Sequence, residues 1–225
     1  MDKPVVQTRK SRPPPGRSVR ADGDSTRARI LQAARRRLIE EGYANLSVRE
    51  IAADAGVNHA LIGYHFQGKQ QLVLAVLDEA NARLLERQTR MYNADAPLSA
   101  KWKQACEFYE EDLKSGFVRL LMELMGASFH DEQLRREFTP RLLGWKKLIE
   151  EATEKFIADT GLELPVSARA IAAWITWFWF GLEAGMTLGV PESEGNQREA
   201  LAAITALIER AEAAAARKTP ARRAR

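Results

Sequence analysis

The stretch "SVREIAADAGVNHALIGYHF" at residues 47–66 decides the fold that we predict for this chain. Ser47 and Glu50 have the spacing of a capping box, in which each side chain hydrogen-bonds the backbone N–H of the other residue. This pair predicts a helix N-terminus at Ser47 and a short helix over residues 47–54. Gly56 then favours a turn, because glycine adopts backbone conformations that other residues avoid.

A second short helix follows this turn. Asn58 is a preferred N-cap residue and predicts a helix over residues 58–65. Two short helices joined by a glycine-containing turn are typical of a helix-turn-helix. In this motif the second helix enters the major groove of DNA, and its first residues contact the edges of the bases. The stretch therefore predicts a DNA-binding motif.

The segment "GYHFQGK" at residues 63–69 also has the spacing of a phosphate-binding P-loop, G-x-x-x-x-G-K. A P-loop follows a strand and places Ser or Thr after its lysine. Here helical residues precede the first glycine, bulky side chains separate the glycines, and Gln70 follows the lysine. We therefore reject a nucleotide site and assign Tyr64, His65 and Lys69 to the phosphates of DNA, which such side chains contact well.

Apolar periodicity predicts helices throughout the rest of the chain, and no segment alternates as a strand would. The expected helices cover residues 25–41, 70–92, 98–114, 117–129, 132–159, 166–189 and 195–215. Gly42 is the expected stop of the first of these helices, and Pro140 is expected to kink the fifth. The predicted fold is all-α.

Composition divides the chain into four parts. Residues 1–24 should form a disordered basic arm and residues 215–225 a disordered basic tail, because few of their side chains can form a core. Residues 25–70 should form a three-helix DNA-binding domain that contains the helix-turn-helix. Residues 71–214 should form a larger helical domain.

Positive charge concentrates at the two ends of the chain. The net charge is +4 overall, +6 over residues 1–69, +4 over residues 211–225 and −6 between them. A basic end on an acidic body is typical of a protein that binds a polyanion such as DNA. The alternative is that the basic ends only favour solubility.

Several other classes of protein or site find no support in the sequence. Cys106 is the only cysteine, so an intrachain disulfide is excluded, which fits the reducing cytoplasm. The longest uncharged apolar run, residues 170–182, is too short to span a membrane. His59, His65 and His130 lack metal-ligand spacing. We therefore expect no metal, no cofactor and no membrane contact.

The segment "ARILQAARRRLIEEGYANLSVREIAADAGVNHALIGYHFQGKQQLVLAV", residues 28–76, resembles the DNA-binding domain of the tetracycline-repressor (TetR) family. The resemblance rests on the pieces "GY…LSVREIA", "AGV", "YHF" and "K..L" taken together. It implies an all-helical, homodimeric transcription regulator, usually a repressor that a small ligand releases from DNA. The implied partners are a palindromic double-stranded operator, a second copy of the chain and a small-molecule effector that the sequence does not identify.

The candidate DNA-binding residues all lie in or beside the two short helices. They are Ser47, Arg49, Asn58, His59, Ala60, Leu61, Gly63, Tyr64, His65 and Lys69.

Position and chemistry suggest different roles for these residues. His59 can hydrogen-bond a base edge, and Ala60 and Leu61 can pack against a thymine methyl group, although Leu61 can instead belong to the core. The resemblance implies a phosphate near Ser47, which can also act only as a cap. It also implies a base or phosphate contact for Arg49, whose alternative is a solvated surface position.

At Gly63 the sequence departs from the pattern, because many family members carry Tyr there. The departure puts a DNA contact at this position in doubt. Glycine also weakens the helix there by roughly 0.5–1 kcal/mol relative to alanine, and it allows the backbone to approach DNA closely.

Large apolar side chains are concentrated in the second domain. The resemblance implies that the last two helices pair with those of a second copy, and an internal core is the alternative. The candidate ligand-binding residues are Phe108, Met122, Met125, Phe129, Trp145, Trp174, Trp177 and Phe178, with Glu123 and Glu183 as possible polar anchors. An aromatic box with a carboxylate could hold an organic cation, but aromatic residues at helical spacing also form plain cores.

Two other functions are weighed against a ligand-responsive repressor. An enzyme would need a nucleophile–base pair, a glycine-rich cofactor loop or a metal-ligand pattern, and the sequence has none of these, so we predict that the chain is not an enzyme. A DNA-binding regulator without a small-molecule effector remains the alternative function.

Overall fold

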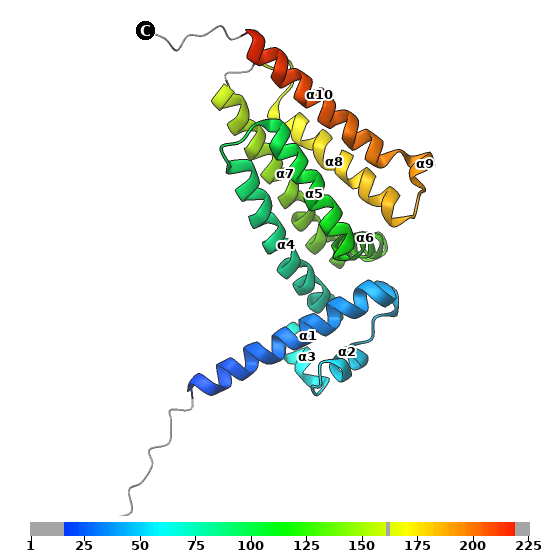
Figure 1. Cartoon of the computed structure of the whole chain (residues 1–225). Coiled ribbons are helices and arrows are strands. Elements are labelled where there is room, and N and C mark those ends of the chain that lie inside the picture. Colours follow the sequence, from blue (N-terminus) through cyan, green and yellow to red (C-terminus); the bar gives the residue numbers. More distant parts are fainter. Residues whose placement is uncertain (1–15, 161–162, 219–225) are drawn as a thin grey trace, which may run out of the picture.

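The computed structural model describes residues 16–160 and 163–218, and within these ranges every regular element is a helix. The helices are α1 (Gly16–Asn45), α2 (Val48–Asp54), α3 (Ala60–Phe66), α4 (Lys69–Asn93), α5 (Leu98–Lys114), α6 (Phe117–Ser128), α7 (Glu132–Thr160), α8 (Ala168–Thr187), α9 (Glu192–Gly195) and α10 (Gln197–Lys218). In Figure 1, α1, α2 and α3 form a small unit, and the long α4 leads from it into a bundle that contains α5 to α10. The all-α prediction is confirmed.

The prediction of disorder is wrong at both ends of the described chain. Helix α1 begins at Gly16, so residues 16–24 are helical, and α10 continues to Lys218. Extending an existing helix costs far less than starting one, and the added part of α10 contains Ala216, Arg217 and Lys218, which are all good helix formers. The rest of the predicted arm and tail, residues 1–15 and 219–225, lies outside the described residues.

Gly42 interrupts α1, as predicted. Its backbone has φ 79° and ψ 169°, which is not helical. Beyond this break, the backbone N–H of Tyr43 donates a hydrogen bond of 3.0 Å to the Glu123 carboxylate on α6. A break that only glycine accommodates readily thus brings the end of α1 against the bundle.

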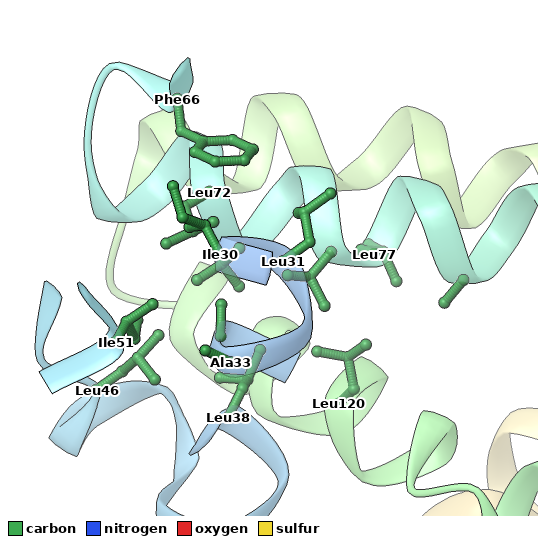
Figure 2. Packing of buried hydrophobic residues seen from close by; sticks show 14 of the residues in the cluster. Ile30, Leu31, Ala33, Leu38, Leu46, Ile51, Phe66, Leu72, Leu77 and Leu120 are labelled. Carbon is green, nitrogen blue, oxygen red and sulfur yellow. The ribbon is translucent and has the colours of Figure 1, made fainter. Parts of the chain in front are cut away.

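One hydrophobic core joins the small unit to the bundle. Figure 2 shows Ile30 and Leu38 of α1, Ile51 of α2 and Phe66 of α3 gathered with side chains of α4 around the same core. Leu120 of α6 belongs to this core and is fully buried. Because these side chains pack directly against one another, a shift of α6 or α4 would displace the helices of the helix-turn-helix.

A second, smaller cluster packs α5, α8 and α10 together. Tyr109, Leu182 and Leu201 form its buried centre, one residue from each of these helices. The indole N–H of Trp102 donates to the Thr205 hydroxyl at 2.9 Å, which links α5 to α10. These contacts join α8 and α10 to α5, and α8 also packs against α7 and α6.

Candidate functional site

Ion pairs between α1 and α2 set the position of the helix-turn-helix. The Arg37 guanidinium lies 2.6 Å from the Asp54 carboxylate and 2.9 Å from that of Glu50, and Arg36 also pairs with Asp54. Hydrogen bonds from Arg37 and Arg36 lower the pKa of Asp54 to about 2. The planar guanidinium suits such multiple contacts with carboxylates.

The capping box predicted at the start of α2 is wrong. Ser47 is the N-cap residue with an extended backbone, as expected, but its side chain accepts no cap hydrogen bond. Glu50 is held by Arg37 of α1 instead. A contact between helices has thus displaced the local motif, and the Ser47 hydroxyl stays available for another partner.

Arg29 of α1 fastens the turn of the motif. Its guanidinium donates hydrogen bonds to the carbonyl oxygens of Ala55, at 3.0 Å from Nε, and of Gly56, at 2.8 Å. Sequence reasoning missed Arg29 and Arg37. The sequence signal that could have indicated these contacts is the basic run Arg35–Arg37 in α1, together with the acidic residues Glu50 and Asp54 in the next helix.

Helix α3 has one buried face and one exposed face. Ile62 and Phe66 are buried, while His59, Ala60 and Gly63 are exposed and Tyr64 is 81% exposed. The exposed residues 59, 60, 63 and 64 recur at helical spacing and so share one face of α3, where a DNA groove can reach them.

The start of α3 differs slightly from the prediction. The helix begins at Ala60 with His59 as the N-cap residue, but the Asn58 side chain accepts a hydrogen bond of 2.9 Å from the Ala60 N–H. Asn58 therefore supplies the side-chain cap that was expected of it. Leu61 is half-buried and packs against the core. This favours a core position for Leu61 over a contact with a thymine methyl group.

The remaining candidates for DNA contact lie around this face. Arg49 is exposed and makes no ion pair within the described residues. His65 is half-buried at the end of α3, with its ring against that of Tyr64. The Lys69 ammonium lies 4.6 Å from the centre of the Tyr43 ring, and partial burial lowers its pKa.

A cavity with a volume of about 90 Å³ lies among α4, α5, α6, α7 and α8. It is lined by Gln88, Tyr92, Ala105, Tyr109, Asp112, Phe117, Leu121, Leu142, Trp145, Leu148, Ile149, Thr176, Trp179, Phe180 and Glu183. Its wall is mainly apolar and aromatic, with a few polar groups, as in most sites for small molecules.

Of the eight predicted ligand-binding residues, only Trp145 lines this cavity. Its indole N–H donates to the Asn81 side chain at 3.2 Å, which fixes the ring. Phe108 stacks on Arg87, Met122 lies in an open groove beside Glu123, Met125 packs on the main core, and Phe178 packs on the second cluster. Phe129, Trp174 and Trp177 are exposed.

The acidic groups of the cavity differ in their partners. The Asp112 carboxylate lies 2.7 Å from the Arg87 guanidinium, so its charge is compensated. No hydrogen bond or ion pair from the described residues reaches the Glu183 carboxylate. Burial and the neighbouring charge of Asp112 raise the pKa of Glu183 to about 8.

This raised pKa predicts a pH-dependent stability. Unfolded Glu183 ionises near 4.5 and folded Glu183 near 8, so the unfolded state binds fewer protons between these values and stability falls as pH rises. The Glu183→Gln variant has no carboxyl group at this position, so its stability does not fall with pH for this reason. We expect the variant to gain, relative to the wild type, on the order of a few kcal/mol between about pH 5 and pH 8. Urea denaturation across this range measures the difference, and parallel curves for the two proteins would refute it.

Large apolar side chains of α8 and α10 are exposed to solvent. Trp174 is 63% exposed and Trp177 is 53% exposed, and the exposed Gly181 follows at helical spacing. Leu188 and Leu207 add further exposed apolar surface. Isolated exposed apolar residues are common, but a group of large ones on adjacent helices marks an interaction surface.

Comparison with known proteins matches both the sequence and the fold. Residues 30–76 match the sequence model of the family described as "Bacterial regulatory proteins, tetR family". An HTH-type transcriptional repressor of Mycobacterium tuberculosis (strain ATCC 25618 / H37Rv) is 32% identical to this chain over 170 residues, which cover 76% of this chain and 81% of that protein.

Two solved structures show how widely the fold is shared. FadR from Bacillus subtilis in complex with stearoyl-CoA has a TM-score of 0.67 at 16% identity, covering 80% of this chain and 96% of its own. A transcriptional regulator from Saccharomonospora viridis in complex with choline has a TM-score of 0.63 at 21% identity. The match covers 79% of this chain and 94% of that regulator. At such identities the likeness concerns the fold alone.

Among the residues that the structure describes, no helix is long and apolar enough to cross a membrane, and no three His, Cys, Asp or Glu side chains gather as a metal site.

Proposed function

Since this chain belongs to the TetR family of bacterial transcriptional regulators, we propose that it acts in the cytoplasm as a homodimeric repressor that a small ligand releases from a palindromic DNA operator. The observation that carries the proposal is the exposed polar face of α3, whose opposite face is buried in the core. A recognition helix needs this combination, because the buried face fixes its orientation and the exposed face reads the groove.

The positions of the side chains on and beside α3 support two different roles in DNA binding, contact with bases and contact with phosphates. His59 and Ala60 stand at the N-terminal end of α3, where side chains meet base edges. Tyr64, His65 and Lys69 stand at its other end and at the start of α4, where donors meet the DNA backbone. Ser47 and Arg49, at the start of α2, offer further hydrogen-bond donors to the DNA backbone.

The exposed face of α8 and α10 supports the homodimer. A two-fold axis places the same surface of each copy against the other, so an apolar face covers itself. Trp174 and Trp177 supply the large aromatic groups that anchor interfaces. Dimerisation would also place two copies of α3 on one side of the molecule, as a palindromic operator requires.

The cavity supports control by a small ligand. Phe117 and Leu121 of α6 form part of its wall, while Glu123 of the same helix accepts a hydrogen bond from the Tyr43 N–H beside the helix-turn-helix. A ligand that moves α6 would therefore act on the DNA-binding unit through existing contacts. Related folds bind stearoyl-CoA and choline, so the fold by itself leaves the ligand class open.

Lys69→Ala should weaken binding to all DNA sequences alike. Its ammonium neutralises a backbone phosphate in this proposal, and each neutralised phosphate contributes to the salt dependence of binding. We expect the slope of log affinity against log salt to fall by about one unit per half-site. Lys69→Arg is the matched control, because it keeps the charge, and fluorescence anisotropy at several salt concentrations provides the measurement.

His59→Ala should change the sequence preference instead. Loss of a base contact costs roughly 1–3 kcal/mol at the base pair concerned and leaves other positions unaffected. Binding to a set of single-base variants of the operator measures this preference. If His59→Ala and Lys69→Ala alter the sequence preference in the same way, the proposed division of work is wrong.

A further inference from the structure

We propose that the cavity binds a small organic monocation, such as a protonated amine or a quaternary ammonium ion, with its charge beside Glu183 and its apolar groups against the aromatic wall. This inference rests on the proposed function, because it names the ligand class of the effector cavity. It follows from the charges, the aromatic groups and the unpaired polar groups of the wall.

The charges of the wall leave one carboxylate without a counter-ion. Arg87 lies 2.7 Å from Asp112 and 3.0 Å from Glu111, so both of these carboxylates have a counter-ion. Within the Arg87 guanidinium, only the Nε–H is buried without a hydrogen-bond partner among the described residues. Glu183 has no such partner within the described residues. The described wall contains no Lys, Arg or His. A monocation would balance the remaining carboxylate, whereas an anion would find no opposite charge.

Aromatic rings surround the same space. The rings of Tyr109 and Trp179 are tilted by 47° with their centres 5.2 Å apart. The other aromatic residues of the wall are Tyr92, Phe117, Trp145 and Phe180. The negative face of an aromatic ring attracts a cation within about 6 Å of its centre, and more strongly where water is excluded. Such rings also accommodate the methyl or methylene groups that an organic cation carries and a metal ion lacks.

Unpaired acceptors add an independent sign of a missing ligand. Tyr109 is 5% exposed, and its hydroxyl has no hydrogen-bond partner among the described residues. The side-chain oxygen of Gln88, also on the wall, is buried without a partner. Buried polar groups usually have partners. The N–H groups of a protonated amine or the hydroxyl of choline would supply a donor, whereas tetramethylammonium tests the charge and the aromatic wall alone.

The volume of the cavity limits the size of the cation. Its 90 Å³ is several times the roughly 10–15 Å³ that one water molecule requires. A compact molecule of a few heavy atoms therefore fits better than a long acyl chain. Choline and tetramethylammonium are suitable probes, and 3,3-dimethyl-1-butanol is the neutral molecule with the shape of choline.

Ligand binding should be coupled to proton release. The titratable groups on the wall are Tyr92 of α4, Tyr109 and Asp112 of α5, and Glu183 of α8, while α6 and α7 contribute none. Burial raises the pKa of both tyrosines to about 12, so neither ionises near neutral pH. A cation beside Glu183 stabilises the carboxylate and lowers its pKa. Binding at pH 7 should therefore release up to one proton per site.

Isothermal titration calorimetry of the full chain tests this inference. We expect choline or tetramethylammonium to bind at least about tenfold more tightly than 3,3-dimethyl-1-butanol at pH 8.5, and Glu183→Gln to abolish this preference. Titrations at pH 7 in two buffers with different ionisation enthalpies should reveal the released proton. Glu107→Gln, at an exposed position of α5 outside the cavity wall, is the matched control and should behave as the wild type does.

Equal binding of the cations and the neutral alcohol, or binding of neither cation, would overturn the inference, as would an unchanged preference in Glu183→Gln. Circular dichroism and a thermal melt first establish that this variant is folded. Failure of the proposed function is detected separately, by measuring operator binding of the ligand-free protein. A protein that binds its operator but ignores every cation contradicts the ligand class alone.

Discussion

Gly42→Ala should lower the free energy of unfolding by about 2–3 kcal/mol, and it should loosen the contact between the DNA-binding unit and α6. The backbone at Gly42, with φ 79° and ψ 169°, lies in a region that is essentially restricted to glycine and costs other residues about 1–3 kcal/mol. A Cβ atom would also lie 2.9 Å from the Glu123 carboxylate. Glu123 would have to move and would lose its hydrogen bond from Tyr43.

Gly63→Ala is the matched control for this substitution. Gly63 lies inside α3, has no positive φ, and a Cβ atom there would meet no other atom within 4 Å. The same chemical change should therefore stabilise the protein by roughly 0.5–1 kcal/mol. Urea denaturation of both variants measures the two effects, and a Gly42→Ala variant as stable as the wild type would contradict the described backbone.

Trp177→Glu should weaken dimerisation by about a thousandfold and weaken operator binding with it. Replacement of an interface tryptophan commonly costs about 2 kcal/mol or more. A two-fold interface contains the residue twice, and about 4 kcal/mol corresponds to three orders of magnitude in the dissociation constant. Trp177 is half exposed in the single chain, so a charge at this position should harm the dimer far more than the protomer.

Leu143→Glu is the control for an added surface charge. Leu143 is 46% exposed on α7 and does not belong to the apolar face of α8 and α10. Sedimentation at several concentrations should find this variant dimeric and Trp177→Glu monomeric. A Trp177→Glu variant that remains a tight dimer would place the interface on another surface.

The secondary structure and the orientation of α3 could be predicted because their signals are local. The α5 helix has the predicted bounds, and the break at Gly42 occurs where glycine was expected to end the first helix. Within α3, Ile62 and Phe66 are four residues apart in the sequence, a spacing that places both side chains on one face, and this face is the buried one. The ends were less predictable, because the helical propensity of Gly16–Asn45 and Gln197–Lys218 outweighed the polar composition of their outer turns.

Of the residues that the sequence suggested for the ligand site, Trp145 and Glu183 line the cavity. The rest of the wall could not be predicted, because it depends on how the helices rotate against one another. Neighbouring residues of a helix point about 100° apart. On α8 the sequence suggested Trp177 and Phe178, whereas the cavity uses Trp179 and Phe180. The Arg37 pairs were missed for a related reason. They join α1 to α2, and a local motif such as the capping box gives no information about them.

Selection of bound fragments from random duplex DNA, with the full chain in the absence of ligand, tests the central claim most directly. A dimer that presents two copies of α3 should enrich a palindrome whose half-sites lie about one helical turn apart, roughly 10 bp from centre to centre, or a multiple of this spacing. Enrichment of no sequence, or of a single half-site without two-fold symmetry, would contradict the account of a dimeric regulator that reads DNA through α3.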